Sequence, residues 1–138
     1  MGSLEIAVPQ ILCDSRITGH EQLREFCARL LAAQSLPATD ALLVSESLVE
    51  SNLRGIDSHG VARLPHYLRR IGTGSIKPRP NICVEPLSPA AARVHGDAGM
   101  GQLVMDRAAA EAIRLARDCG AGWVSVVDSS HCGALAWY

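Results

Sequence analysis

The feature of this sequence that most constrains its fold is a change of hydrophobic period near residue 78. Over residues 18–71, apolar side chains recur every three or four positions, as they do along amphipathic helices. Past residue 78, short apolar runs bounded by proline and glycine flank one long alanine-rich stretch, an order typical of alternating strands and helices. We therefore predict an α/β (α+β) chain. A helical N-terminal domain with an extended arm would occupy residues 1–77, and the beginning of an α/β domain would occupy residues 78–138.

Two helices are predicted to pack as an antiparallel pair in the first part. The first covers residues 18–34, and Thr18 with Glu21 has the spacing of a capping box. The Leu-Pro step that follows it interrupts the helical pattern. The second helix is expected to start with Thr39 or Asp40 as its cap.

A third helix is predicted after a short turn. Gly55 would end the second helix, because glycine is favoured just past the last helical turn. Ser58 is a plausible N-cap for the next helix, which would continue to Ile71. Pro65 removes a backbone donor, so either this helix kinks there or its regular part begins only near Leu64.

The second part of the chain reads as strand, strand, helix, strand. Short strands are predicted at 82–84 and 92–95 and are expected to be followed by a glycine-rich turn at 96–101. A helix is predicted over 102–119, and a buried strand over 123–127. The chain then ends on an apolar run with no polar tail, so we expect it to stop within a larger fold.

Composition excludes several classes of function. The net charge is -1, with 13 basic and 14 acidic residues interspersed, so neither nucleic acid nor a charged membrane is an expected partner. No apolar run is long enough to span a bilayer. Five widely spaced cysteines without a CxxC pair predict neither a disulfide framework nor a zinc site, and favour a reducing, cytoplasmic location. No histidine or cysteine cluster has metal-ligand spacing, so no metal is predicted.

The turn after Gly55 carries the first candidate site. A spacing of four, three and four residues puts His59, Arg63, His66 and Arg70 on one helix face. Such a face could bind a carboxylate, with arginine as the anchor and histidine as the proton donor, or it could simply be solvated. Ser58, beside His59, could contribute to the same site or serve only as a helix cap.

The second candidate is His131, which directly follows the strand predicted over 123–127. Ligands collect at the carboxyl ends of strands in α/β sheets, and an imidazole there can exchange protons near neutral pH. The alternative is a capping turn built by the neighbouring serines. Two other signals are weak: Gly96–Gly101 lacks the spacing of a dinucleotide loop, and Cys132 lacks a visible orienting group for nucleophilic chemistry.

Taken together, these blocks resemble the second type of malate/L-lactate dehydrogenase family, from about Thr18 to Tyr138. The resemblance is carried by Arg54 to Arg63 with its Ser-His-Gly core, by Asp97 to Gly101, by the alanine-rich helix, and by Ser130 to Ala134. The family includes ureidoglycolate, sulfolactate and diketogulonate dehydrogenases and cyclic imino-acid reductases. It implies an α/β cofactor-binding fold of the L-sulfolactate dehydrogenase-like type.

The resemblance also implies an activity. It implies an oxidoreductase that uses NAD or NADP, acts on a small 2-hydroxy or 2-oxo acid, and forms a homodimer. His131 would be the catalytic acid/base, with His59 beside it. Ser58, His59 and Arg63 would bind substrate, with Arg63 anchoring the carboxylate.

Family members are several hundred residues long, so most cofactor-binding residues are expected beyond Tyr138. These 138 residues alone are then incomplete for catalysis. The alternative from a different class is a non-catalytic, truncated paralogue that acts as a helical self-association or interaction module.

Overall fold

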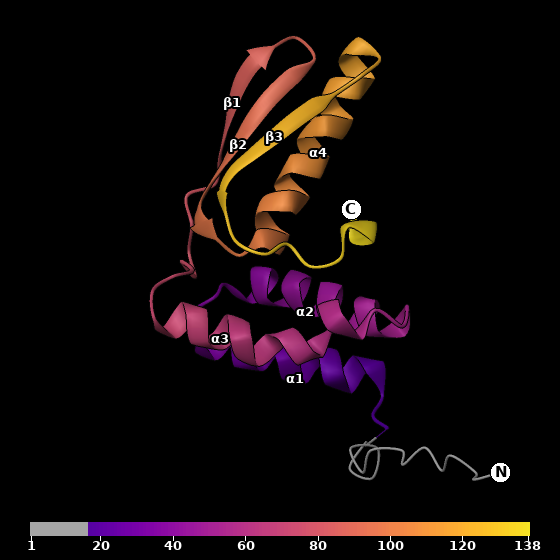
Figure 1. The fold of residues 1–138 in the computed structure, drawn as a ribbon, viewed down its shortest axis with the longest axis vertical. Helices are drawn as coiled ribbons and strands as arrows, with labels where there is room; N and C mark the ends of the chain where they lie inside the picture. The colour runs from indigo at the N-terminus through magenta and orange to yellow at the C-terminus, as the bar shows by residue number, and fades with distance from the viewer. Residues whose placement is uncertain (1–16) are drawn as a thin grey trace, which may run out of the picture.

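The computed structural model describes residues 17–138, and the arm expected at the N-terminus lies almost wholly outside them. The predicted order of elements is confirmed, with helices first and a mixed strand and helix unit after them (Figure 1). The helices and strands, in chain order, are α1 (His20–Ala33), α2 (Ala38–Leu53), α3 (Leu64–Gly72), β1 (Cys83–Ser88), β2 (Ala91–Gly99), α4 (Gly101–Cys119) and β3 (Trp123–Ser129).

The first two helices form where they were predicted, but their capping was predicted wrongly. Helix α1 begins after Gly19 and α2 begins after Pro37, and neither start carries a side-chain cap hydrogen bond. The expected capping box of Thr18 and Glu21 is therefore absent. Thr39 and Asp40 lie inside the first turn of α2, because the chain enters this helix directly from the preceding Leu-Pro step.

The segment predicted as a third helix is divided in two. Two short 3₁₀ turns, Asp57–His59 and Val61–Arg63, precede the regular helix α3. Gly60 separates the turns with an extended backbone, so a continuous helix from Ser58 was wrong and a start near Leu64 is confirmed. Pro65 then falls in the first turn of α3, where a missing N–H costs no hydrogen bond.

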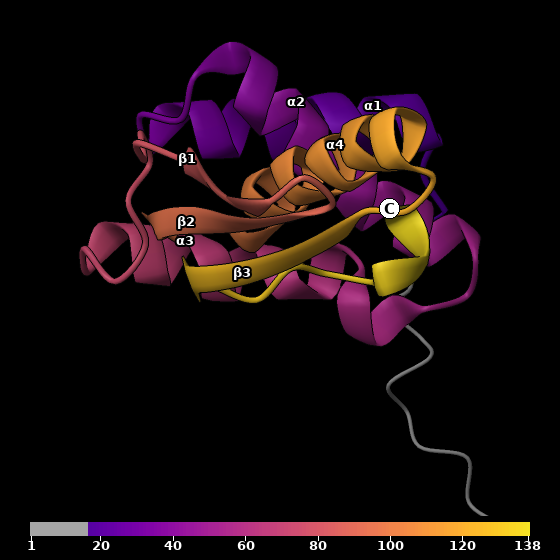
Figure 2. The ribbon, with the colours of Figure 1, turned by 90° about the horizontal axis from the view of Figure 1, so that it is seen from above.

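The three strands form one sheet in the order β1-β2-β3. Strands β1 and β2 are antiparallel, whereas β2 and β3 are parallel and are joined through α4. A parallel pair needs such a crossover because its strands run in the same direction. Figure 2 shows α4 lying along one side of the sheet.

The strands extend further than the sequence pattern predicted. Pro86 lies within β1, and residues 96–99 belong to β2 instead of forming a glycine-rich turn. The extra residues are accommodated by an irregularity between His95 and Gly99, where Asp97 and Ala98 take positive φ angles of 49° and 56°. Strand β3 is also not buried as expected, since Trp123 at its start is 75% exposed.

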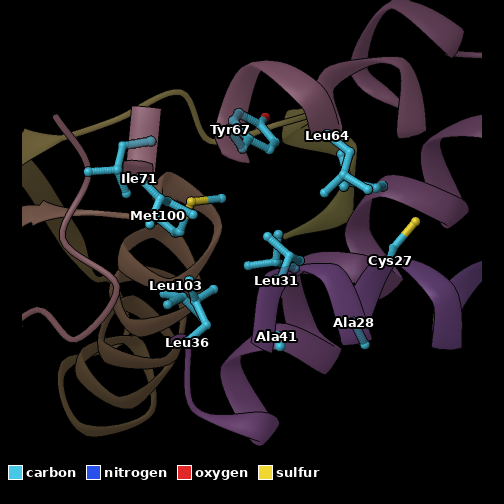
Figure 3. Close-up of a cluster of buried hydrophobic side chains, with 13 residues drawn as sticks. Cys27, Ala28, Leu31, Leu36, Ala41, Leu64, Tyr67, Ile71, Met100 and Leu103 are labelled. Carbon is cyan, nitrogen blue, oxygen red and sulfur yellow. The ribbon is translucent and has the colours of Figure 1, made fainter. Parts of the chain in front are cut away.

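The main hydrophobic core joins the N-terminal helices to the beginning of α4. Helices α1, α2 and α3 contribute most of it, and Met100 and Leu103 enter it from the other part of the chain (Figure 3). A smaller cluster of Val94, Val104 and Ala108 fixes α4 to the sheet. The start of α4 is therefore held against both layers, while the predicted domain boundary near residue 78 stays a prediction.

Among the helices of residues 17–138, none combines the length and apolar character needed to cross a bilayer.

Candidate functional site

His131 lies in the segment that follows β3, where the chain passes the beginning of α4. The backbone there is tightly packed: a Cβ atom added at Gly101 would lie 2.4 Å from the carbonyl carbon and oxygen of His131. The Gly101 N–H also donates a hydrogen bond of 2.9 Å to the hydroxyl of Ser130. The glycine that opens α4 therefore fixes the backbone that carries His131.

Replacing Gly101 with alanine should destabilise the protein by about 1–3 kcal/mol, because the contacted atoms are backbone and cannot rotate away. Gly72→Ala is the matched control, since Gly72 has open space around its Cβ position and lies in a helix. That control should be neutral or slightly stabilising. Urea unfolding of both variants would test this, and equal free energies of unfolding would contradict the packing described.

The imidazole of His131 makes its hydrogen bonds through Nδ1. The hydroxyl of Tyr67 lies 2.8 Å from this atom, and the Gly133 N–H donates to it at 3.3 Å. Tyr67 is completely buried, and it reaches His131 from α3. The ring of His59 stacks on the ring of His131, with centroids 5.4 Å apart and planes at 29°. Residues from the two parts of the chain therefore meet around one imidazole.

The surroundings lower the pKa of His131 below its ordinary value. Burial is the largest cause, since it disfavours the charged imidazolium, and the positive charges of Arg63, His59 and His66 add to it. Burial also raises the pKa of Tyr67, which keeps this phenol neutral. The pair is thus a neutral phenol beside an imidazole that holds a second proton weakly.

The pKa of His131, followed by NMR, should therefore lie below that of an exposed histidine. In Arg63→Gln it should rise, because a neighbouring positive charge opposes protonation and its removal relieves that opposition. Arg70→Gln serves as the control, since it removes an arginine from α3 that is not among the causes of the shift. A pKa for His131 that is unchanged in Arg63→Gln would contradict the proximity of the two groups.

The turn that carries Ser58 and His59 is braced by Asn52 from α2. The Asn52 amide donates to Asp57 at 2.5 Å, and its oxygen accepts the Val61 N–H at 2.8 Å. Only glycine fits at position 60, because a Cβ there would lie 2.2 Å from the Asn52 side-chain oxygen. Asn52 was not identified from the sequence, where it reads as an ordinary polar position of a helix.

Within this turn, a backbone carbonyl orients the Arg63 side chain. Its Nε donates to the Ser58 carbonyl at 2.7 Å. Across residues 17–138 no carboxylate forms an ion pair with it. The Ser58 hydroxyl lies 2.9 Å from Nδ1 of His59, so Ser58 does not cap a helix as one interpretation held. Arg63 is oriented through one nitrogen, and its terminal nitrogens remain available to an anion.

The predicted four-residue helix face is not formed. His59 and Arg63 lie in the two 3₁₀ turns, whereas His66 and Arg70 belong to α3. His59 stacks on His131, while His66 is exposed. The structure therefore brings His59 and Arg63 into the neighbourhood of His131, whereas His66 influences the His131 pKa from an exposed position and makes no hydrogen bond to it.

The glycine-rich segment at residues 96–101 does not form a phosphate-binding loop. Gly96 and Gly99 lie in β2, and a Cβ on Gly99 would strike the ring of Pro80 at 2.7 Å. The Gly101 N–H, at the start of α4, is already taken by Ser130. Within residues 17–138, no group of three or more histidine, cysteine or acidic side chains could hold a metal ion. Residues 96–101 thus contribute a strand and the start of α4 instead of a glycine-rich phosphate-binding loop.

Comparison with known proteins gives a consistent result. The family model described as malate/L-lactate dehydrogenase matches residues 18–138. The malate dehydrogenase of Pyrococcus horikoshii is 38% identical over 86% of this chain and 33% of its own length. The ureidoglycolate dehydrogenase (NAD(+)) of Escherichia coli K12 is 30% identical over 86% of this chain and 34% of its own length.

The fold agrees with these sequence matches. The solved structure of sulfolactate dehydrogenase from Methanocaldococcus jannaschii superposes with a TM-score of 0.86 at 32% identity, over 89% of this chain and 36% of that one. The chain thus spans about a third of the length of the relatives it matches. Because the match covers nearly all of the described residues, the chain belongs to the malate/L-lactate dehydrogenase family.

Proposed function

We propose that these residues form the acid/base and carboxylate-binding side of an NAD(P)-dependent oxidoreductase that interconverts small 2-oxo and 2-hydroxy acids. One observation carries the proposal: His131 is held through Nδ1 by Tyr67 and is stacked on His59. This arrangement leaves Nε2 as the atom that can exchange a proton with a substrate. The relatives are dehydrogenases of malate, sulfolactate and ureidoglycolate, which supports this class of substrate.

In the proposed reaction, Arg63 binds the substrate carboxylate with its terminal nitrogens. The bond from its Nε to the Ser58 carbonyl limits rotation of the guanidinium, and so lowers the entropy lost when the acid binds. Ser58 and His59 complete the polar wall around the substrate. During reduction the imidazolium of His131 transfers its Nε2 proton to the carbonyl oxygen and is left neutral with its other proton on Nδ1; during oxidation Nε2 takes a proton back.

The nicotinamide cofactor supplies the hydride when it is bound. Within residues 17–138 the glycine-rich segment forms no dinucleotide-binding loop, so we give these residues no role in holding the cofactor. NAD or NADP would be held by sequence that the relatives have and that these 138 residues do not include. One relative is a ureidoglycolate dehydrogenase (NAD(+)), which supports a nicotinamide cofactor without choosing between NAD and NADP for this chain.

A panel of 2-oxo acids assayed with NADH and NADPH in the full-length enzyme tests the proposal. We expect reduction of 2-oxo acids and little reduction of their methyl esters, because an ester removes the charge that Arg63 binds. Equal turnover of acid and ester would contradict the carboxylate site. The homodimer and the cytoplasmic location remain part of the same proposal, and light scattering would check the dimer.

A further inference from the structure

Gln102 is a buried polar residue that the proposed reaction does not use. It is the second residue of α4, it is fully buried, and it was not identified from the sequence. Its Nε2 donates a hydrogen bond of 3.0 Å to the hydroxyl of Tyr67, the group that lies 2.8 Å from Nδ1 of His131. A chain of three side chains therefore runs from the core to the imidazole.

The donor and acceptor roles in this chain of hydrogen bonds follow from a backbone donor. The Gly133 N–H points at Nδ1 of His131, and a backbone N–H can only donate. Nδ1 is then an acceptor, so Tyr67 must also donate its single hydroxyl hydrogen to it. The Tyr67 oxygen is left to accept, which agrees with the side-chain NH₂ of Gln102 as the donor. Because Nδ1 carries no proton, a neutral His131 carries its proton on Nε2.

We propose that Gln102 is a positioning residue that sets the tautomer of His131. By donating to the Tyr67 oxygen, Gln102 turns the Tyr67 hydroxyl hydrogen toward Nδ1, and His131 rests with an N–H at Nε2. That N–H can donate a hydrogen bond that orients a substrate carbonyl oxygen, whereas the proton itself is transferred from the imidazolium. The imidazole is thus prepared for a 2-oxo acid before the substrate arrives.

The same chain of hydrogen bonds opposes protonation of His131 at Nδ1. In the imidazolium, Nδ1–H would have to donate to the Tyr67 oxygen, which already accepts from Gln102. The Tyr67 hydrogen would then have to leave its position facing Nδ1. This rearrangement adds to the burial and to the charges of Arg63, His59 and His66 that already lower the pKa of His131. The imidazolium is consequently a stronger acid toward the substrate.

Imidazole ¹⁵N NMR of the 138-residue chain tests the proposal, because pyrrole-type and pyridine-type nitrogens have distinct signals. The His131 signals are assigned by their loss in His131→Asn. In the wild-type chain we expect neutral His131 to be protonated mainly at Nε2. In Gln102→Met the ratio of Nδ1–H to Nε2–H should rise roughly two- to tenfold, the equivalent of one hydrogen bond.

Two further variants separate positioning from packing. Tyr67→Phe keeps the ring and removes the hydroxyl, so it should raise the same ratio, and adding Gln102→Met to it should change nothing more. Ser47→Ala is the matched control: Ser47 is buried beside Gly133, as Gln102 is, but has no contact with Tyr67 among the hydrogen bonds described. It should leave the ratio unchanged.

A wild-type His131 protonated mainly at Nδ1 would overturn the proposal. An unchanged ratio in Tyr67→Phe would overturn it too, and this variant serves if Gln102→Met does not fold. If adding Gln102→Met to Tyr67→Phe raised the ratio again by the same factor, the effect of Gln102→Met would come from loosened packing and not from its hydrogen bond to Tyr67. The catalytic meaning of the tautomer rests on the proposed function, but the tautomer is measured without turnover, so either idea can fail alone.

Discussion

Replacing His131 with asparagine is expected to slow 2-oxo-acid reduction in the full-length enzyme by roughly 10²–10⁴-fold, the usual contribution of a general acid. Asparagine retains a hydrogen-bond donor for the substrate carbonyl but cannot release a proton to the forming alkoxide. The loss should therefore fall on kcat, with a smaller change in KM. Steady-state kinetics at saturating NADH would measure both constants.

Two controls accompany this variant. Binding of NADH, followed by its fluorescence, should remain largely intact, because in the proposed function His131 exchanges a proton with the substrate and does not hold the cofactor. His66→Asn removes an exposed histidine of α3 that contributes to the lowered pKa of His131 but has no hydrogen bond to it, so this variant should shift that ionisation upward and keep most of the rate. Unchanged turnover in His131→Asn would refute the assignment, as would an equal loss in His66→Asn.

Replacing Arg63 with glutamine should weaken the recognition of 2-oxo acids by roughly 10- to 150-fold in kcat/KM. The estimate corresponds to about 1.5–3 kcal/mol for hydrogen bonds to a charged group. Most of the loss should lie in KM, because the carboxylate carries the same charge in the substrate and in the transition state. Arg63→Lys should lose less, since it keeps the charge but not the planar fork.

The matched control is Arg70→Gln, which removes an arginine of α3 that the structure does not bring to His131. It should leave kcat/KM nearly unchanged. The methyl ester of the substrate provides a second control, because the Arg63 substitution should cost little when no carboxylate is present. A loss of equal size for acid and ester would indicate that Arg63 acts through the fold and not through the substrate.

Most of the fold could be predicted because local signals agreed with it. The helical spacing of apolar residues placed α1, α2 and α4, and Gly55, at a φ of 72°, follows the end of α2 as expected. The glycine-rich turn failed because β2 continues through it, with Asp97 and Ala98 in left-handed conformations. Asp97 accepts the Asn81 N–H at 2.9 Å, a tertiary contact that no local pattern reveals.

The candidate site was predicted only in part. Ser58, His59, Arg63 and His131 stood out because their side chains carry chemistry. The spacing of His59, Arg63, His66 and Arg70, however, suggested one helix face. Gly60, whose extended backbone lies against the Asn52 side chain, breaks that helix. Burial, and not a sequence motif, marks two of the residues that were missed.

Tyr67 and Gln102 are those two residues. Both are fully buried, and a buried polar group requires a partner. A search for polar residues at otherwise apolar positions of predicted helices could have identified them as candidates. It could not have paired them, because their contact depends on how α3 and α4 pack against each other.

The most direct test of the account is the pH dependence of kcat/KM for 2-oxo-acid reduction in the full-length enzyme. The acid form is the imidazolium, so the rate should fall as pH rises through one ionisation. Its pKa should lie below that of an ordinary histidine and should match the value found for His131 by NMR. The same ionisation should move upward in Arg63→Gln. A profile that keeps this ionisation in His131→Asn would contradict the account.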